Sequence, residues 1–319
     1  DDVGFSDFGC YGSPIATPTI DAIAGRGLRY TGFHTTAMCS TTRAALLTGR
    51  NHHSVGVGCL ANFDSGYPGY RGKISKEAGT IAEMLRPHGY RNYMLGKWHV
   101  TPLTESGATG PFDGWPLGRG FDRYYGFMDA ETDQYAPELV RDNTPVDPPG
   151  TFATGYHLTS DLVDQGIRYI ADHVGDNAET PWLMWLALGA CHAPHQAPFD
   201  LIDKYDAIFA EGWDVERERR LARQIALGIV PKGTAMWEHS RAAWRAAFAL
   251  SAAPATGGGE PERTSHCRQC ACPRGARGSH RPHPNCPNST TIGQTIAAAT
   301  RAGPVSTDTK LCASAATPT

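Results

Sequence analysis

Between residues 1 and about 245, short apolar runs alternate with segments whose apolar residues recur at helical spacing. Two of the helical segments carry clear boundary signals: Pro18 follows Thr17 at the first helical position, and Gly49 follows a run that ends at Thr48. The pattern predicts helices over residues 18–24, 40–48 and 81–85, and a longer helix from Thr159 or Ser160 to 174. It predicts strands over residues 28–33, 90–95 and 181–188.

Each predicted helix has one apolar face. Ile20, Ile23 and Ala24 form the predicted inner stripe of the first helix, and Thr80 with Glu83 forms a capping box for the helix that follows it. The predicted buried stripe of the long helix consists of Leu162, Val163, Ile167, Ile170 and Val174. The last predicted strand is continuously apolar, as is typical of a strand buried on both faces. Because helices and strands alternate, we expect an α/β fold in which a mostly parallel mixed sheet is sandwiched between helices.

The composition changes sharply after about residue 245. Residues 251–319 contain no Phe, Trp, Tyr or Met, and they hold five of the nine cysteines. A segment so poor in large apolar side chains cannot offset the conformational entropy of ordering by burial. We therefore expect two regions: residues 1–245 form the folded part, and residues 246–319 form a low-complexity tail that is disordered or non-native.

The cysteines of the two regions differ in their surroundings. Those of the first region, Cys10, Cys39, Cys59 and Cys191, are scattered and do not indicate a disulfide framework. Two hypotheses remain open for the tail. One is translation of a GC-rich coding sequence in the wrong frame. The other is a zinc site, whose candidate ligands are His266, Cys267, Cys270, Cys272, His280, His283 and Cys286.

Charge and hydropathy exclude some classes of protein. The 319 residues carry a formal net charge of −3, whereas a protein that binds nucleic acid through phosphate contacts would be strongly basic. No run of about 18 or more apolar residues is present, so we expect no membrane-spanning helix. We therefore expect neither nucleic acid nor a membrane among the partners.

Four polar clusters stand at predicted strand ends or at a helix start. Parallel sheets place their ligands at the carboxyl ends of the strands, so these clusters are the candidate site. They are Asp1-Asp2, Gly96–His99, Gly189–His195 and Cys39–Arg43. Carboxylates, a lysine, histidines and a nucleophile at the positive end of a helix are suited to binding and cleaving an anionic, tetrahedral, oxygen-rich group. Lys97 and His99 are two positions apart, so on an extended segment they would point to the same side.

These clusters carry a family resemblance. Residues 37–50, AMCSTTRAALLTGR, resemble the first signature of the sulfatases, and residues 89–99, GYRNYMLGKWH, resemble the second. The opening DDVGFSD is similar to the metal-binding start of that family, and residues 118–122 are similar to a later loop. The resemblance extends from residue 1 to about 235 and is strongest toward bacterial arylsulfatases. It implies the alkaline-phosphatase-like α/β fold and hydrolysis of sulfuric esters.

The resemblance also implies how the reaction proceeds. Cys39 is expected to be oxidised by a formylglycine-generating enzyme to an aldehyde. One hydroxyl of the hydrated aldehyde attacks sulfur, and the second loses its proton so that collapse to the aldehyde expels sulfate. Arg43 orients the hydrate, while Lys97 and His99 bind the sulfate oxygens and the nucleophile. His192 binds sulfate and assists protonation of the leaving oxygen, a role for which His195 is the alternative.

A calcium site is implied by the same resemblance. Its expected ligands here are Asp1, Asp2 and the side chain at Cys39, and the ion would polarise the sulfate oxygens. The family has a later Asp-Asn pair and a later Lys, and neither is found after residue 200. We therefore expect the chain to be a truncated or frameshifted fragment that also lacks its true N-terminus. Such a fragment would bind calcium weakly and have little or no turnover.

Smaller departures and alternatives complete the picture. Thr41 stands where the family has Pro or Ala, within the segment that the modifying enzyme reads, and Asn92 replaces Ser or Thr in the second signature.

Two rival functions remain open: a phosphonate or phosphate monoester hydrolase of the same superfamily, and an inactive module that binds anionic ligands. The substrate is expected to be a small sulfate ester that enters between residues 63–72 and 129–134. The bacterial cytoplasm or periplasm is the expected compartment.

Overall fold

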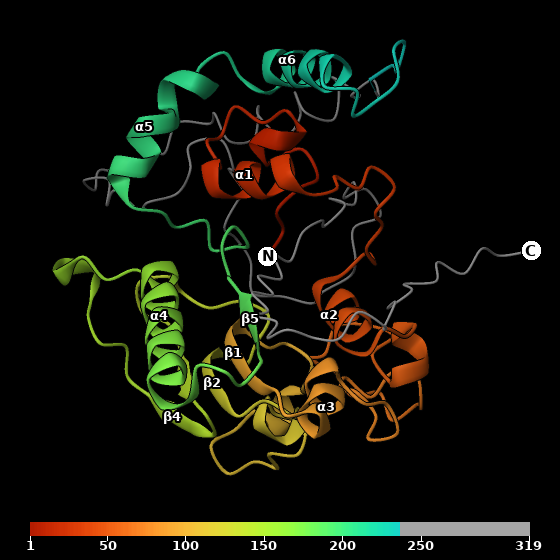
Figure 1. Ribbon diagram of the computed structural model, residues 1–319, viewed down its shortest axis with the longest axis vertical. Coiled ribbons are helices and arrows are strands. Elements are labelled where there is room, and N and C mark those ends of the chain that lie inside the picture. The colour runs from red at the N-terminus through yellow and green to blue at the C-terminus, as the bar shows by residue number, and fades with distance from the viewer. Residues whose placement is uncertain (237–319) are drawn as a thin grey trace, which may run out of the picture.

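The structure is a computed structural model, and it describes residues 1–236 (Figure 1). The predicted boundary near residue 245 and the tail with its cysteines lie outside the described residues. The helices are α1 (Pro18–Arg26), α2 (Cys39–Thr48), α3 (Ile81–Leu85), α4 (Leu158–Asn177), α5 (Phe199–Phe209) and α6 (Trp213–Ala226). The strands are β1 (Arg91–Lys97), β2 (Arg123–Phe127), β3 (Leu139–Arg141), β4 (Thr144–Val146) and β5 (Trp182–Ala187). Short 3₁₀ turns cover Gly9–Tyr11, His52–Val55, Arg86–His88, Leu103–Glu105, Leu117–Arg119 and Phe152–Thr154.

The five strands form one mixed sheet in the order β4-β3-β2-β1-β5. β1 is parallel to both of its neighbours, so that Leu95 is paired with Tyr125 of β2 on one side and with Leu186 of β5 on the other. β3 and β4 add an antiparallel edge beside β2. Because the three central strands run the same way, their carboxyl ends meet at one edge of the sheet. The predicted α/β fold is confirmed.

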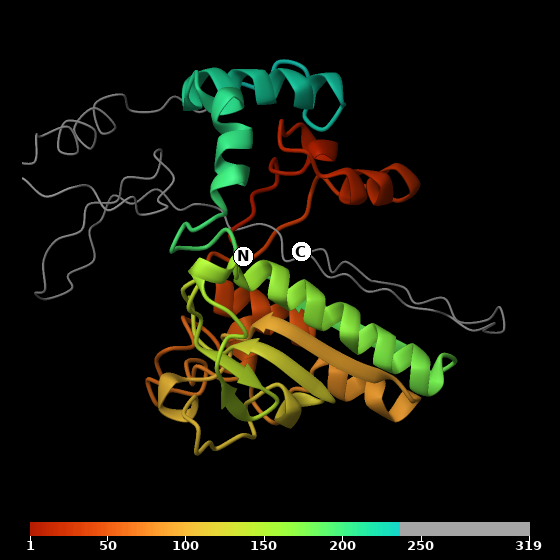
Figure 2. The same cartoon turned by 90° about the vertical axis from the view of Figure 1, so that its left-hand side faces the viewer.

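Helices cover both faces of this sheet (Figure 2). Alternation along β1 sends Met94 into one hydrophobic core and Tyr93 and Leu95 into the other. α4 packs on the face of Leu95, and α2 with α3 packs on the face of Met94. The sheet is therefore buried on both faces, which explains why β5 reads as a continuous apolar run.

Local signals set the ends of α2 and α3, as predicted. α2 ends at Thr48 because Gly49 adopts a left-handed backbone conformation with φ of 65°. At α3 the side chain of Thr80 accepts a hydrogen bond from Glu83 N (3.2 Å), and the Glu83 carboxylate accepts one from Thr80 N (2.7 Å). The start of α2 places Cys39, one position earlier than expected, as the first helical residue.

The long helix α4 buries a different stripe from the predicted one. It begins at Leu158, because the ring of His157 accepts a hydrogen bond from Thr159 N (3.2 Å) and caps the helix. Three residues of the predicted stripe are exposed: Val163, Ile167 and Val174. The buried face consists of Leu158, Asp161, Leu162, Gln165, Gly166, Tyr169 and His173. Polar residues can be buried on this face of α4 because they have hydrogen-bond partners. For example, Tyr125 Oη donates to Asp161 Oδ2 (2.6 Å). The pattern of aliphatic residues alone therefore predicts the wrong buried face.

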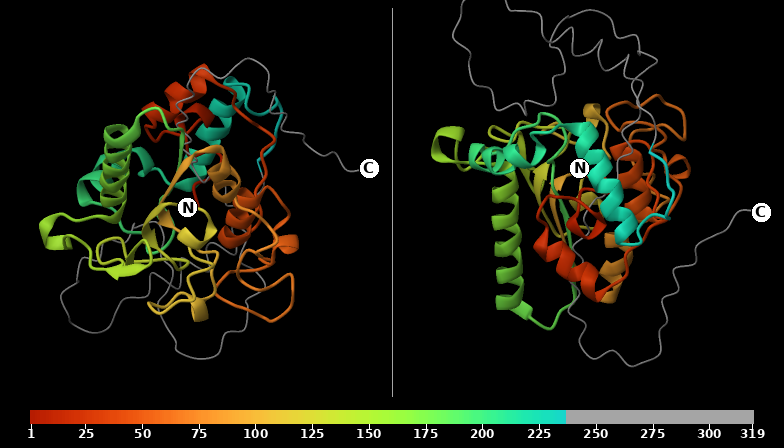
Figure 3. Two further views of the ribbon diagram at one scale, coloured as in Figure 1. Left: turned by 60° about the horizontal axis from the view of Figure 1, so that its bottom comes forward. Right: turned by 90° about the horizontal axis from the view of Figure 1, so that it is seen from above.

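Two predictions near the start of the chain are wrong. Residues 28–33 form no strand, and Leu28 is 84% exposed. An apolar run becomes a strand only where a neighbour pairs with its backbone, and none of the described strands lies beside this segment. α1 buries no residue, so the predicted inner stripe around Ile23 does not face a core. α1 belongs instead to a separate layer with α5 and α6, away from the sheet (Figure 1, Figure 3).

α6 holds the segment that follows the opening acidic pair. Arg220 Nη1 donates to Asp7 Oδ1 (2.7 Å), and Arg223 Nε donates to Gly12 O (2.6 Å). These contacts fix residues 7–12 and so help to place the preceding residues at the sheet edge. Among the described helices, none combines the length and apolarity needed to cross a bilayer.

Candidate active site

Three segments that are distant in sequence meet at the carboxyl edge of the sheet. Lys97 is the last residue of β1, and Cys39 is the first residue of α2. Asp1 lies at the end of β5, where its main-chain nitrogen donates to Leu188 O (2.9 Å) and Ala190 O (3.0 Å). The start of the chain is thus held between β5 and α2 (Figure 1).

A buried group of charges forms the floor of the site. Lys97 Nζ donates to Asp1 Oδ2, and Arg43 Nη2 lies 3.7 Å from Asp1 Oδ1. Arg43 Nη1 also donates to Lys97 O (2.5 Å), and its guanidinium lies 5.7 Å from the ring centroid of Trp185. The side chains of Asp1, Arg43 and Lys97 are fully buried. Two cations face one carboxylate, so this group retains a positive charge that suits an anionic ligand.

Burial lowers the pKa of both cations. Desolvation, and then the neighbouring charge of Arg43, lowers the pKa of Lys97 to about 8, while Cys39 and Asp2 act in the opposite direction. Desolvation lowers the pKa of Arg43 to about 10. Both side chains therefore remain cationic near neutral pH, when an anionic substrate has to be held.

Cys39 faces His99 across this floor. The sulfur lies 3.2 Å from His99 Nδ1, and Cys39 is 8% exposed. Desolvation, followed by the charges of Lys97 and Arg43, lowers the pKa of His99 to about 2. The imidazole is therefore neutral at physiological pH and can accept a hydrogen bond from the group at position 39.

His99 is held from its other side by two residues that sequence reasoning did not identify. Its Nε2 lies 2.7 Å from Asn62 Oδ1, and Asn62 Nδ2 donates to Asp129 Oδ1 (2.6 Å). β1 ends at Lys97 and the backbone at His99 is left-handed (φ 51°), so the alternation of an extended strand does not by itself place this ring. No motif in the sequence links Asn62 to a histidine 37 positions later.

Asp2 and His192 lie at the rim. The side chain of Asp2 is 38% exposed, and its Oδ2 lies 3.7 Å from His192 Nε2. His192 Nδ1 donates to Ala193 O (2.8 Å) and lies 3.7 Å from Glu131 Oε2. His195, the alternative, is exposed and bonds to Cys191 O (3.1 Å). His192 is therefore adjacent to Asp2 of the acidic pair, whereas the ring of His195 contacts the backbone at Cys191.

The predicted site residues thus fall into two groups. Five of them form one buried contact network: Asp1, Cys39, Arg43, Lys97 and His99. The other two, Asp2 and His192, contact each other above it. Cys39 and the carboxylate of Asp1 thus belong to the same buried network. The four cysteines of the described part are free thiols, as predicted.

The residues present match only part of a calcium site. Asp1 Oδ1 is buried and accepts no hydrogen bond from the described residues, which is the state expected of an oxygen that binds a cation. However, in the part of the chain that the structure describes, no three His, Cys, Asp or Glu side chains are grouped to hold a metal ion. The predicted ligand set of Asp1, Asp2 and Cys39 stays a prediction, and calcium prefers six to eight oxygens.

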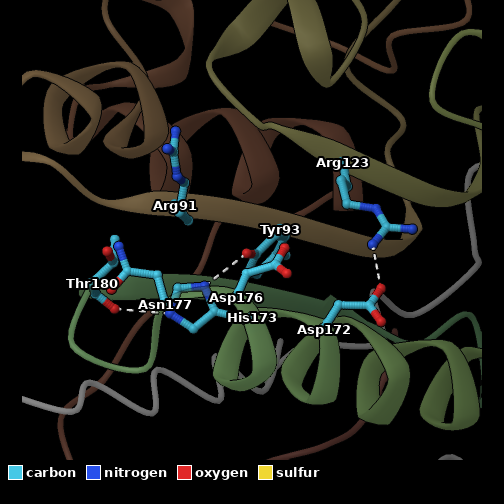
Figure 4. Close-up of a pocket in the computed structure, with 8 residues that line it drawn as sticks. All are labelled: Arg91, Tyr93, Arg123, Asp172, His173, Asp176, Asn177 and Thr180. Carbon is cyan, nitrogen blue, oxygen red and sulfur yellow. Dashed lines mark hydrogen bonds and ion pairs between the residues drawn. The ribbon is translucent and has the colours of Figure 1, made fainter.

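A separate cavity of about 210 Å³ lies at the opposite edge of the sheet, where β1 and β2 begin (Figure 4). Two of its charged side chains form an ion pair, in which Arg123 Nη1 donates to Asp172 Oδ2 (2.8 Å). His173 is bonded through both ring nitrogens, to Tyr93 Oη and to Thr180 O (2.9 Å each). None of its lining residues belongs to the predicted site. The predicted site residues therefore lie away from this cavity, at the carboxyl edge of the sheet.

Comparison with known proteins identifies the class of this site. The sequence model of the family described as Sulfatase matches residues 1–266, so the chain belongs to the sulfatase family. An uncharacterized sulfatase of Schizosaccharomyces pombe is 32% identical over 253 residues, covering 73% of this chain and 44% of the relative. The arylsulfatase of Klebsiella aerogenes is 30% identical over 246 residues, covering 73% of this chain and 50% of the relative. The chain thus spans about half the length of these curated relatives.

Solved structures support the fold. Ps i-CgsB in complex with k-i-k-neocarrahexaose has a TM-score of 0.51 at 23% identity, covering 71% of this chain and 52% of that one. A chain from work on glycosaminoglycan metabolism by Bacteroides thetaiotaomicron has a TM-score of 0.53 at 16% identity, covering 72% of this chain and 54% of that one. The alkaline-phosphatase-like arrangement implied by the sequence motifs is confirmed.

Proposed function

We propose that this chain carries the active site of a sulfuric ester hydrolase of the arylsulfatase type, which cleaves a small sulfate monoester. The observation that carries the proposal is the buried contact network of Cys39, His99, Lys97, Arg43 and Asp1, in a chain of the sulfatase family. Each of these residues comes from a motif that resembles a sulfatase signature. The network combines a nucleophile position, a neutral base and a cationic floor.

Substrate binding follows from the charges. The ammonium of Lys97 and the guanidinium of Arg43 are buried and fixed, Lys97 by Asp1 and Arg43 by Lys97 O. A sulfate group above this floor would gain charge-assisted hydrogen bonds in a region from which water is largely excluded. As negative charge shifts within the transferring group, these fixed cations stabilise it without reorganising.

Position 39 supplies the nucleophile. Conversion of Cys39 to formylglycine would provide a hydrated aldehyde with two geminal hydroxyls. His99 Nδ1, which lies 3.2 Å from the sulfur, is placed to accept a hydrogen bond from a group at this position. His192 stands at the rim beside Asp2, where it would meet the leaving oxygen and donate a proton to it.

Calcium and the modifying enzyme are the two partners of this proposal. Asp1 and Asp2 would contribute to the calcium site, where the ion polarises sulfate oxygens when bound, and Asp1 Oδ1 is the best placed ligand. A formylglycine-generating enzyme would recognise the segment around Cys39. That segment contains Thr41, whose hydroxyl donates to Met38 O (2.8 Å).

The proposal is tested by comparing kcat/KM on an aryl sulfate and on an aryl phosphonate with the same leaving group, in the presence of calcium. We expect the sulfate to be cleaved faster by at least about tenfold, because both esters carry one negative charge and the chain belongs to the sulfatase family. Equal or faster cleavage of the phosphonate would instead support a phosphonate hydrolase. Binding of both compounds without turnover of either would identify an inactive anion-binding module, for which the incomplete metal ligand set is the relevant observation.

A further inference from the structure

Behind His99, a chain of hydrogen bonds leads away from the nucleophile position. His99 Nε2 lies 2.7 Å from Asn62 Oδ1, and Asn62 Nδ2 lies 2.6 Å from Asp129 Oδ1. Asp129 Oδ1 also accepts a hydrogen bond from Ala130 N (2.6 Å). Asn62 and Asp129 are half-buried, and neither comes from a signature motif.

The direction of each hydrogen bond follows from the chemistry of the last residue. An ionised carboxylate only accepts, so Asp129 requires the NH₂ group of Asn62 to face it. The carbonyl oxygen of that amide then faces His99, and a carbonyl oxygen requires a donor. His99 Nε2 therefore carries the proton. In a neutral imidazole the other nitrogen, Nδ1, then has a free lone pair directed at Cys39.

We propose that Asn62 and Asp129 are positioning residues that hold His99 in the Nε2–H tautomer, so that the lone pair of Nδ1 faces the side chain at position 39. The catalytic consequence rests on the proposed sulfatase function, whereas the tautomer itself does not. Asp129 acts through Asn62, and Asn62 acts through His99. Neither residue is required to touch the substrate.

Both positioning residues are attached to rigid parts of the fold. Ala61, next to Asn62, is fully buried, and its main-chain nitrogen donates to Ser40 Oγ (2.9 Å) in α2. Asp129 lies two positions after the end of β2, and Met128 O between them accepts a hydrogen bond from His99 N (3.1 Å). The position of the His99 ring is therefore fixed relative to both α2, which carries Cys39, and the central sheet.

The tautomer can be read directly from the ¹⁵N chemical shifts of the imidazole nitrogens, with a His99→Gln variant to assign the signals. In the full chain we expect a pyrrole-like Nε2 and a pyridine-like Nδ1. In Asp129→Asn the amide of Asn62 is free to turn, and in Asn62→Leu the acceptor is lost, so both variants should show a mixture of tautomers. Asp64→Asn, which removes a carboxylate from the same loop, should leave the spectrum unchanged.

A reciprocal exchange separates positioning from simple packing. In the double variant Asn62→Asp/Asp129→Asn, a carboxylate accepts from His99 Nε2 and an amide donates to it, so the Nε2–H tautomer should return. The same exchange should restore a kcat that falls about tenfold in Asp129→Asn while KM stays unchanged. An Nδ1–H tautomer in the unmodified chain, or Nε2–H retained in full in both Asp129→Asn and Asn62→Leu, would overturn the proposal. The expected tautomer in a chain without sulfatase turnover would overturn the proposed function alone.

Discussion

Replacing Cys39 with alanine is expected to lower aryl sulfate turnover by at least about 10³-fold, to the uncatalysed background, from a parental rate that we expect to be low because the metal ligand set is incomplete in the described residues. The side chain at position 39 is the only group of the buried network that is placed to attack the substrate, and the remaining residues bind and orient. The rate is measured as release of the phenol at saturating substrate. Because the sulfur is buried but small, the thermal midpoint should change little.

Cys59→Ala is the matched control for this prediction. Cys59 is also a free thiol, but it is exposed. The control should retain the parental rate, which would exclude a general effect of losing one thiol. A Cys39→Ala variant that cleaves the ester at the parental rate would contradict the assignment of position 39 as the nucleophile.

The largest effect on stability is expected from Arg119→Met, at about 3–5 kcal/mol. Arg119 is 1% exposed, and its guanidinium donates to Ile74 O (2.6 Å), to Ala78 O (2.5 Å) and to both carboxylate oxygens of Glu83. Methionine fills part of the volume but removes the donors to the carbonyl oxygens of Ile74 and Ala78, and it leaves Glu83 without its ion pair. The free energy of unfolding is measured in urea, for both proteins, at neutral pH.

Arg86→Met and a pH series serve as controls for the arginine prediction. Arg86 pairs with Asp122 at the surface, so the loss of this pair should cost less than about 1 kcal/mol of stability.

Burial raises the pKa of Glu83, but hydrogen bonds from Thr80 and Arg119 outweigh the effect of burial and leave the pKa below its ordinary value. Stability from this pair is therefore present above about pH 4.3 and lost as the pH falls through the lowered pKa. A difference between parent and Arg119→Met that does not shrink on acidification would contradict the role of the pair.

Local signals in the sequence predict those elements whose stability is local. The capping box of Thr80 and Glu83 starts α3 where expected, and the left-handed Gly49 ends α2 where expected, because their hydrogen bonds form within one or two turns. The face of α4 could not be predicted in the same way. Asp161 is buried where Tyr125, which is 36 positions earlier, and Tyr156 both donate to it, and the helical pattern of α4 does not include these partners.

The site shows the same division. Motifs predict Cys39, Lys97 and His99, and the fold brings them together at the carboxyl edge because β1 ends there and α2 begins there. Asn62 and Asp129 could not be predicted, since their contacts join loops that only the tertiary structure makes adjacent. The predicted calcium ligands at Asp1 and Asp2 remain untested.

The mass of the tryptic peptide that spans residues 30–43 tests the central claim most directly, because Cys39 is its single cysteine. The chain is produced together with a formylglycine-generating enzyme, and the peptide is measured without alkylation. Conversion of the thiol to an aldehyde lowers the mass by about 18 Da, and this is the result that we predict. A peptide that carries the unmodified thiol throughout would contradict the proposed nucleophile and, with it, the sulfatase mechanism for this chain.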